Sequence, residues 1–254
     1  MLYIVKVLKM RRWRRKQKQS SEKRCGYGVC PHFLYKGCDK MTMEYKSNYE
    51  KVTEDWKKRF LAMDQERLIE RFQLDHDEQW LYLHYLGQQL KLSRTSGKVL
   101  FADREEIPGF DTVITVYNMF YYAKEHPAAS GELVPFRLVK RVYPFERAYQ
   151  KQILEPFARL FSGHVKELRE ACEKLGGTKL PQGDAGYRIP VYPYFDMAVL
   201  FWDRDDEFEA QGNMLFDSNI TDFVHEENVV CIAADVVKYL TGAAGMEEMK
   251  IYAG

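Results

Sequence analysis

A short acidic stretch is the first feature of this sequence that could carry chemistry. Within FWDRDDEFEAQGNMLFD, residues 201–217, carboxylates are closely spaced, and such oxygens can bind Mg²⁺ or Ca²⁺ or act as general acids and bases. A calcium loop of the EF-hand type also needs a glycine at its sixth position and a glutamate at its twelfth, a pattern that this stretch lacks. We therefore interpret it as a solvated turn between two buried strands, with no metal bound. The acidic residues of the turn are Asp203, Asp205, Asp206, Glu207 and Glu209.

The sequence GDAGYR at residues 183–188 is the best candidate for a ligand site. Its small residues would let a ligand approach the backbone. Arg188 could then hold a carboxylate or a phosphate with its forked guanidinium, while Asp184 could accept a hydroxyl or an amine. No strand–GxxxxGK–helix context surrounds the stretch, so it is not a phosphate loop. The alternative is a tight turn that leads into a strand, with Gly183 in the turn.

A second candidate cluster lies near the N-terminus and consists of Cys25, Cys30, His32 and Cys38. Thiolates and imidazoles bind zinc, and thiolates hold iron–sulfur clusters. The spacing is a poor match to the knuckles of structural zinc sites and to the short C-x2-C runs of ferredoxins. We therefore favour free thiols, with a metal site as the alternative.

Charge is divided unevenly along the chain, which has 254 residues and a formal net charge of +1. Residues 1–24 contain ten Lys and Arg and a single Glu, whereas residues 41–254 contain 26 basic and 35 acidic residues. A body that binds nucleic acid needs a basic face, so we expect no nucleic acid on residues 41–254. The basic segment alone could bind nucleic acid or anionic lipid, but such a short arm is more often a disordered appendage.

The composition changes near Met41 and Met43. We expect residues 1–40 to be a disordered, basic, cysteine-containing tail and residues 41–254 to form a single domain; translation that begins at one of the two methionines would remove the tail. No apolar run approaches the roughly 18 residues of a membrane span. The apolar opening also precedes the basic run, which is the reverse of a secretory signal. We therefore expect a cytoplasmic protein with no membrane partner.

Apolar periodicity predicts helices and strands in segregated runs. Helical spacing predicts one helix over 45–63 and a second that Asp64 caps, and alternation predicts a three-stranded meander over 81–101. This α+β pattern favours a mainly antiparallel sheet with helices segregated around it. The further predicted elements are helices from Asp111 to before Pro127, from Pro144 to 161 with a kink at Pro156, from Ser162 to 175, and from Asp222 or a later residue to Gly242, with buried strands at 187–191, 197–202 and 214–216 and a short extended piece at 132–139.

Several short motifs of the second half resemble a known family. They are Gly131-Glu132-Leu133, Gly176-Gly177, Gly183-Asp184, Trp202 followed by Asp205-Asp206-Glu207-Phe208, and Leu215-Phe216-Asp217. Together they resemble the family catalogued as domain of unknown function 3786, over about residues 45–242. Members usually have a glycine in the acidic turn, where this chain has Arg204. The resemblance implies a soluble protein typical of anaerobic bacteria and archaea, with some relatives joined to iron–sulfur modules, and it implies no activity.

From these features we expect an accessory protein of anaerobic metabolism that binds a small molecule or a protein partner, which the resemblance relates to iron–sulfur proteins. The alternative is a hydrolase- or isomerase-like enzyme that uses Asp184, Arg188 and an acid from 203–209. A concave pocket with a desolvated acid at these loops would favour the enzyme, and a flat surface would favour the binding protein. The sequence indicates no particular cofactor.

Overall fold

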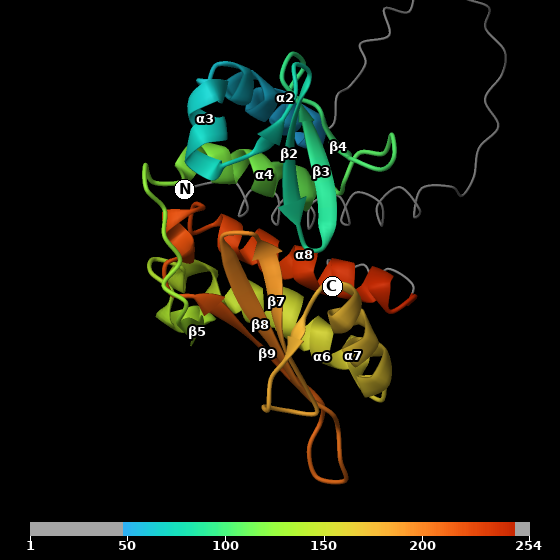
Figure 1. The fold of residues 1–254 in the computed structure, drawn as a ribbon. Helices are drawn as coiled ribbons and strands as arrows, with labels where there is room; N and C mark the ends of the chain where they lie inside the picture. The colour runs from blue at the N-terminus through green and yellow to red at the C-terminus, as the bar shows by residue number, and fades with distance from the viewer. Residues whose placement is uncertain (1–47, 247–254) are drawn as a thin grey trace, which may run out of the picture. The chain divides into compact units, whose positions relative to one another are not determined.

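The computed structural model describes residues 48–246 (Figure 1). Within them, the strands form two antiparallel sheets of four and five strands, and the helices pack around these sheets. The predicted α+β class with antiparallel pairing is therefore confirmed, with the strands divided between two sheets. The expected tail, residues 1–40, lies outside the described residues, together with its cluster of Cys25, Cys30, His32 and Cys38.

Two helices, α2 (Asn48–Leu61) and α3 (Gln65–Phe72), begin the described chain. Asp64 is the N-cap of α3, as predicted. Its Oδ1 accepts the backbone N–H of Arg67 at 3.1 Å, which satisfies one of the amides that the start of a helix leaves unpaired. The apolar stripe of each helix faces the core, where Phe60 is fully buried.

The first sheet has the strand order β1-β2-β3-β4, and all neighbours are antiparallel. The short strand β1 adds to the predicted meander. It pairs with β2 because Asp77 closes the turn between them, where its carboxylate accepts the N–H groups of Gln79 and Trp80, each at 2.7 Å. The strands are β1 (Asp75–His76), β2 (Trp80–Tyr85), β3 (Gln88–Ser93) and β4 (Val99–Phe101).

The tip of the β2–β3 hairpin is buried against the second half of the chain. Leu86 and Gly87 form the two-residue turn with φ of 47° and 74°, and the left-handed conformation is unfavourable for leucine. Packing holds it there, because Leu86 is 1% exposed and its N–H donates to the carbonyl of Val191 at 2.9 Å. Gly87 packs on the backbone of Leu175.

Helix α4 (Phe110–Tyr122) is buried on nearly every side, as its continuous apolar run predicts. Its ends differ from the prediction. Asp111 lies in the first turn, whereas the N-cap is Gly109, and no side chain caps this end. The helix stops at Tyr122, before Pro127, because the next residue turns to extended backbone.

The chain around Pro156 changes its helical winding. Proline lacks an N–H, and in a regular α-helix its ring would collide with the carbonyl four residues earlier. A π-helical turn, η3, precedes Pro156, and this wider turn accommodates the ring within an otherwise continuous helix. The predicted helix is present, and the disturbance expected at Pro156, a kink or a restart, takes the form of a change from π-helical to α-helical winding. The elements of this region are β5 (Leu133–Pro135), the 3₁₀ turns η1 (Phe136–Leu138) and η2 (Tyr143–Phe145), α5 (Glu146–Tyr149), η3 (Gln150–Leu154) and α6 (Glu155–Phe161).

Helix α7 (Val165–Lys174) begins later than predicted, because His164 rather than Ser162 is its N-cap. Cys172, on its inner face, is buried. The second sheet follows in the order β5-β9-β8-β7-β6, again with antiparallel neighbours, and residues 203–210 connect β8 to β9. Its remaining strands are β6 (Thr178–Lys179), β7 (Ala185–Tyr192), β8 (Phe195–Trp202) and β9 (Gln211–Asp217).

Strand β8 is buried as far as Phe201 but not at its last residue. Trp202 is 41% exposed, so the prediction that the whole segment 197–202 is buried is wrong for this side chain. Successive side chains of a strand point to opposite faces, and Trp202 pairs with Gln211 at the loop end of the hairpin, beside the exposed residues 204–209.

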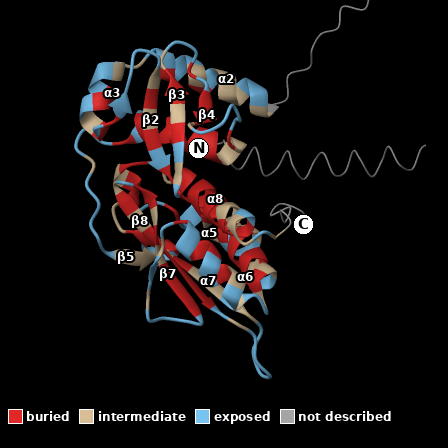
Figure 2. Cartoon of the chain, turned by 45° about the vertical axis from the view of Figure 1, so that its right-hand side comes forward, coloured by how far each residue is buried: buried red, intermediate tan, exposed pale blue. Residues whose placement is uncertain are grey.

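Helix α8 (Asn228–Ala243) lies between the two sheets in Figure 1, and Figure 2 shows it buried along most of its length. It contacts α4 and α7. Of the expected starts, Asp222 or a later residue, the later one holds: Asp222 belongs to a separate 3₁₀ turn, η4 (Ile220–Asp222), and Glu227 is the N-cap of α8. Across residues 48–246, no helix combines the length and the apolar character that crossing a membrane requires.

Asp217 fastens the edge strand β5 to β9. The residue is 2% exposed, and its carboxylate accepts the N–H groups of Ser130 at 3.0 Å and Gly131 at 2.8 Å. It also accepts the N–H of Asn219 at 2.8 Å, which is the local turn that the sequence suggests after this strand. A single buried carboxylate thereby satisfies the backbone amides of two separate segments.

We expect Asp217→Asn to lower the free energy of unfolding by about 2 kcal/mol, because an amide offers one acceptor oxygen where the carboxylate offers two charged ones. Denaturant unfolding measures the change. Asp206→Asn, in the exposed loop, is the control and should stay within about 0.5 kcal/mol of the wild type. Equal effects of the two substitutions would contradict the role of Asp217.

The exposure of Trp202 gives a second prediction. Trp202→Ala should cost no more than about 1 kcal/mol, whereas truncation of its fully buried neighbour, Phe201→Ala, should cost about 3–5 kcal/mol. The midpoints of urea unfolding, with the slope of each curve, distinguish the two variants. A Trp202→Ala variant as unstable as Phe201→Ala would show that the tryptophan ring is covered.

Candidate functional site

Residues 183–188, the predicted ligand site, form a turn and the start of β7. The Asp184 carboxylate accepts the N–H of Asp203 at 2.8 Å, and its backbone carbonyl accepts the guanidinium of Arg169. Gly183 has φ of 74° and lies against the backbone of Phe201, so this turn requires glycine. The carboxylate of Asp184, which the sequence predicts to bind a ligand, therefore bonds to the first residue of the acidic loop.

Arg188 lies further along β7 and pairs with Asp196 of β8 at 3.5 Å. Both side chains are about two-fifths exposed, so the ion pair is well solvated and contributes little to stability. Neither Asp184 nor Arg188 lines the cavity described below. Their role in ligand binding stays a prediction.

The acidic loop makes local hydrogen bonds to its own backbone. Asp205 Oδ1 accepts the N–H groups of Glu207 and Phe208 at 2.8 and 2.7 Å, and these bonds lower the pKa of Asp205. Asp203 Oδ1 accepts the N–H of Gly163 at 2.9 Å, and Asp206 is exposed. In the part of the chain that the structure describes, no group of three or more His, Cys, Asp and Glu side chains is arranged to hold a metal ion.

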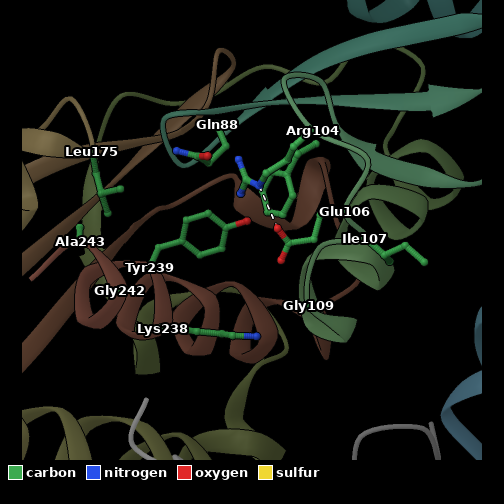
Figure 3. A pocket seen from close by; sticks show the side chains of 11 residues that line it. Gln88, Arg104, Glu106, Ile107, Gly109, Leu175, Lys238, Tyr239, Gly242 and Ala243 are labelled. Carbon is green, nitrogen blue, oxygen red and sulfur yellow. Dashed lines mark hydrogen bonds and ion pairs between the residues drawn. The ribbon is translucent and has the colours of Figure 1, made fainter. Parts of the chain in front are cut away.

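A cavity of about 520 Å³ lies elsewhere, between the first sheet and the C-terminal half of α8 (Figure 3). Its wall comes from the start of β3, the end of β4 and the loop after it, the start of α4, the residue after α7 and the last turns of α8. Apolar side chains and glycines make up part of this wall. The polar side chains that line it are those of Gln88, Arg104, Glu106, Lys238 and Tyr239.

Arg104 makes one ring contact and two ion pairs at the edge of this cavity, where its side chain is 40% exposed. Its guanidinium carbon lies 3.5 Å from the centroid of the Phe101 ring, a cation–π contact. Its Nε donates to Glu106 at 3.0 Å, the bond drawn as a dashed line in Figure 3, and Nη1 donates to Asp103 at 2.9 Å. The stacking and the two carboxylates together orient the planar fork of Arg104.

Lys238 brings a second cation to the same cavity. Figure 3 shows its side chain extending along α8 toward Gly109, the N-cap of α4. The amine at the end of this flexible side chain lies directly against Gly109, in the space that a Cβ at this position would occupy. The start of α4, with its uncapped N–H groups and its partial positive charge, lies on the same side of the cavity as Lys238.

One helical turn before Tyr239, α8 carries the fully buried Asp235. Its Oδ2 accepts hydrogen bonds from Tyr85 Oη at 2.9 Å and from Thr112 Oγ1 at 3.0 Å. Burial, and then the nearby charge of Asp111, raise the pKa of Asp235 to about 8, although these hydrogen bonds and Lys238 act in the opposite direction. Asp235 therefore holds a proton through much of the neutral range.

Tyr239 connects this buried acid to the cavity. Its hydroxyl lines the cavity and lies 3.4 Å from Thr112 Oγ1, and burial raises the pKa of Tyr239 to about 12, so the phenol keeps its proton. The ring of Tyr85 lies against those of Tyr192 and Tyr239, with centroids 4.9 and 6.0 Å away. Asp235 Oδ1 and Tyr192 Oη are buried without a hydrogen-bond partner among residues 48–246.

Neither the cavity nor the role of Asp235 was predicted from the sequence. The signal for Asp235 is an acidic residue inside the apolar helical run NVVCIAADVVKYL, because an acid is rarely buried unless it is paired or functional. No comparable signal exists for the cavity, whose polar residues come from elements far apart in the sequence.

The raised pKa of Asp235 predicts how stability depends on pH. Between its unfolded value near 3.9 and its folded value, the folded state binds more protons, so the wild type should lose stability as pH rises. Asp235→Asn cannot ionise and should show a flatter profile between about pH 5 and 8, measured by urea unfolding at each pH. Parallel profiles for the two proteins would contradict the assignment.

No curated protein and no solved structure is significantly similar to this chain. A family model does match it, from residue 64, the N-cap of α3, to residue 239 in the wall of the cavity. The matched segment includes both sheets, the hydroxyls around Asp235 and most of α8. The chain therefore belongs to the family described as "Domain of unknown function (DUF3786)".

Proposed function

We propose that this protein binds a small molecule with an anionic group, a carboxylate, sulfate or phosphate, in the cavity beside Tyr239. One observation carries the proposal: Arg104 and Lys238 come from different elements and line one cavity of a size suited to a small ligand. The two cations differ in kind. The guanidinium of Arg104 offers a planar fork, and the amine of Lys238 is a compact point charge.

The rest of the cavity supports the same chemistry. The uncapped start of α4 adds backbone donors next to Lys238, as at many sites that bind anions at helix N-termini. The apolar side chains of Ile107 and Leu175 line the same cavity and could contact the organic part of a ligand. Glu106 already binds Arg104, so a ligand anion would compete with this carboxylate.

The wider setting of the proposal rests on the sequence and on the family resemblance. We propose a cytoplasmic accessory protein of anaerobic metabolism with a small-molecule ligand or a protein partner, in relation to iron–sulfur proteins.

An enzyme is the second candidate, and the buried acid favours it. A carboxyl group with a pKa of about 8, joined through hydroxyls to a cavity, is suited to proton transfer. The hydrolase- or isomerase-like enzyme that the sequence suggests would instead use Asp184, Arg188 and an acid from 203–209. In the structure, Asp184 and Asp205 accept local backbone N–H groups.

Binding can be tested by thermal shift and calorimetry with sodium sulfate, phosphate and acetate at constant ionic strength. Sulfate or phosphate should raise the melting temperature, and Lys238→Met should weaken binding by roughly ten-fold, which is about 1.4 kcal/mol. Glu106→Gln should strengthen binding, because it frees Arg104 from an internal competitor.

Lys151→Met provides the matched control, because Lys151 is exposed and does not line the cavity. It should bind each anion as the wild type does. Anion effects that are the same in the wild type, Lys238→Met and Glu106→Gln would show that the anions act on the protein surface in general, and the proposed site would be wrong. Turnover of a substrate that Asp235→Asn abolishes would instead favour the enzyme.

A further inference from the structure

Three hydroxyl and carboxyl groups connect the interior of the protein to the wall of the cavity. Tyr239 Oη lies 3.4 Å from Thr112 Oγ1, which in turn lies 3.0 Å from Asp235 Oδ2. Thr112 and Asp235 are fully buried, and Tyr239 lines the cavity. A change in the proton at one end of this chain can therefore change the hydrogen bonds at the other.

The direction of the hydrogen bonds depends on the charge of Asp235. An ionised carboxylate only accepts, so Thr112 must give its single hydroxyl proton to Oδ2. The oxygen of Thr112 is then an acceptor for the Tyr239 hydroxyl, whose proton points inward. In this state the phenol presents only oxygen lone pairs to the cavity, and these repel an anion.

Protonation of Asp235 permits the opposite direction. Oδ1 has no partner among the described residues, so a proton there would lack an acceptor, whereas a proton on Oδ2 can be donated to Thr112. Thr112 then gives its own proton to Tyr239 Oη, and the phenol proton turns toward the cavity. Each hydroxyl keeps one donated bond, and no covalent bond other than that of the carboxyl proton changes.

We propose that an anion binds in this cavity together with one proton, which Asp235 takes up and which turns the Tyr239 hydroxyl into a donor toward the ligand. The proposal rests on the proposed function, the binding of an anionic group between Arg104 and Lys238. It adds that Asp235 controls binding through Thr112, although it lies outside the lining of the cavity.

The charges around Asp235 also couple its protonation to anion binding. The positive charge of Lys238 favours the ionised form of Asp235, whereas the negative charge of Asp111 opposes it. An anion next to Lys238 would offset the positive charge and add to the effect of Asp111, so proton uptake would become easier. The ionisable and hydroxyl groups that face Asp235 are Tyr85 of β2, Tyr192 of β7, Asp111 and Thr112 of α4, and Lys238 and Tyr239 of α8.

The sign of the pH effect follows from linkage. If the anion binds the protonated form more tightly, the pKa of Asp235 is higher in the bound state than in the free protein. Binding then takes up protons at pH values near and above the pKa of the free protein. Affinity should then be highest at low pH and should fall as pH rises through about 8, the pKa of Asp235 in the free protein. A site of fixed cations alone would show little change over this range.

Calorimetry with sulfate on the full-length protein measures the coupling directly, because sulfate does not titrate near neutral pH. Titrations near pH 8 in two buffers of different ionisation enthalpy, free of phosphate and sulfonate, should show uptake of a substantial fraction of one proton per sulfate. The dissociation constant should rise by roughly ten-fold between about pH 6.5 and pH 9.

Two isosteric variants assign the effect. Asp235→Asn should abolish proton uptake. Thr112→Val keeps the acid but interrupts the hydroxyl chain, so its sulfate affinity at low pH should fall toward that of the wild type at high pH. Thr241→Val is the matched control, because Thr241 is a buried threonine that bonds only the carbonyl of Val237 in its own helix, and it should behave as the wild type.

The outcomes separate the two proposals. Sulfate binding without proton uptake in the wild type, or with uptake that survives Asp235→Asn, would overturn the role of Asp235 and leave the anion site intact. If sulfate fails to bind at any pH, both proposals are wrong. Wild-type titrations that show no proton uptake would overturn the proposal even if a core variant does not fold.

Discussion

The burial of one carboxyl group, that of Asp235, is the constraint on which the arrangement of the described chain depends. Helix α8 contacts α4 and α7, so an acid in its middle has no access to water. Among the described residues, Tyr85 and Thr112 supply its hydrogen bonds, and Tyr85 lies 150 positions away in the sequence. A shift of α8 along its axis would leave the carboxyl unpaired at a cost of several kcal/mol, so this polar contact fixes the register of the last helix against the first sheet.

Much of the fold could be predicted because it depends on local chemistry. The side chain of Asp64 caps α3 by accepting the backbone N–H of Arg67, and Pro156 disturbs the helical winding because its ring displaces a backbone hydrogen bond. The predictions failed for residues whose side chains make tertiary contacts. Asp222, the first of the starts considered for the last helix, instead forms an ion pair with Lys124 at 2.8 Å, and the helix begins at the later position. The helix that follows has no side-chain cap, because packing on all sides fixes where it starts.

The candidate site was much less accessible to sequence reasoning. Short motifs identify residues that are close along the chain, and Asp184 does contact the first residue of the acidic loop, but this contact joins two turns. The cavity depends on the approach of Lys238 to Gly109 and on the stacking of Arg104 on Phe101, which no spacing rule specifies. An acid within an apolar helix was the one local indication, and its meaning depends on which hydroxyls the fold brings to it.

The buried turn between β2 and β3 bears on how the protein can fold at all. Leu86 holds an unfavourable backbone conformation, and the acceptor for its N–H is a carbonyl of β7, which is made much later in the chain. The first sheet cannot reach its final state before the second sheet is present to receive the hairpin. The described chain should therefore behave as one cooperative unit, and a nascent or truncated chain that ends before β7 would expose a strained, apolar hairpin tip with an unpaired amide.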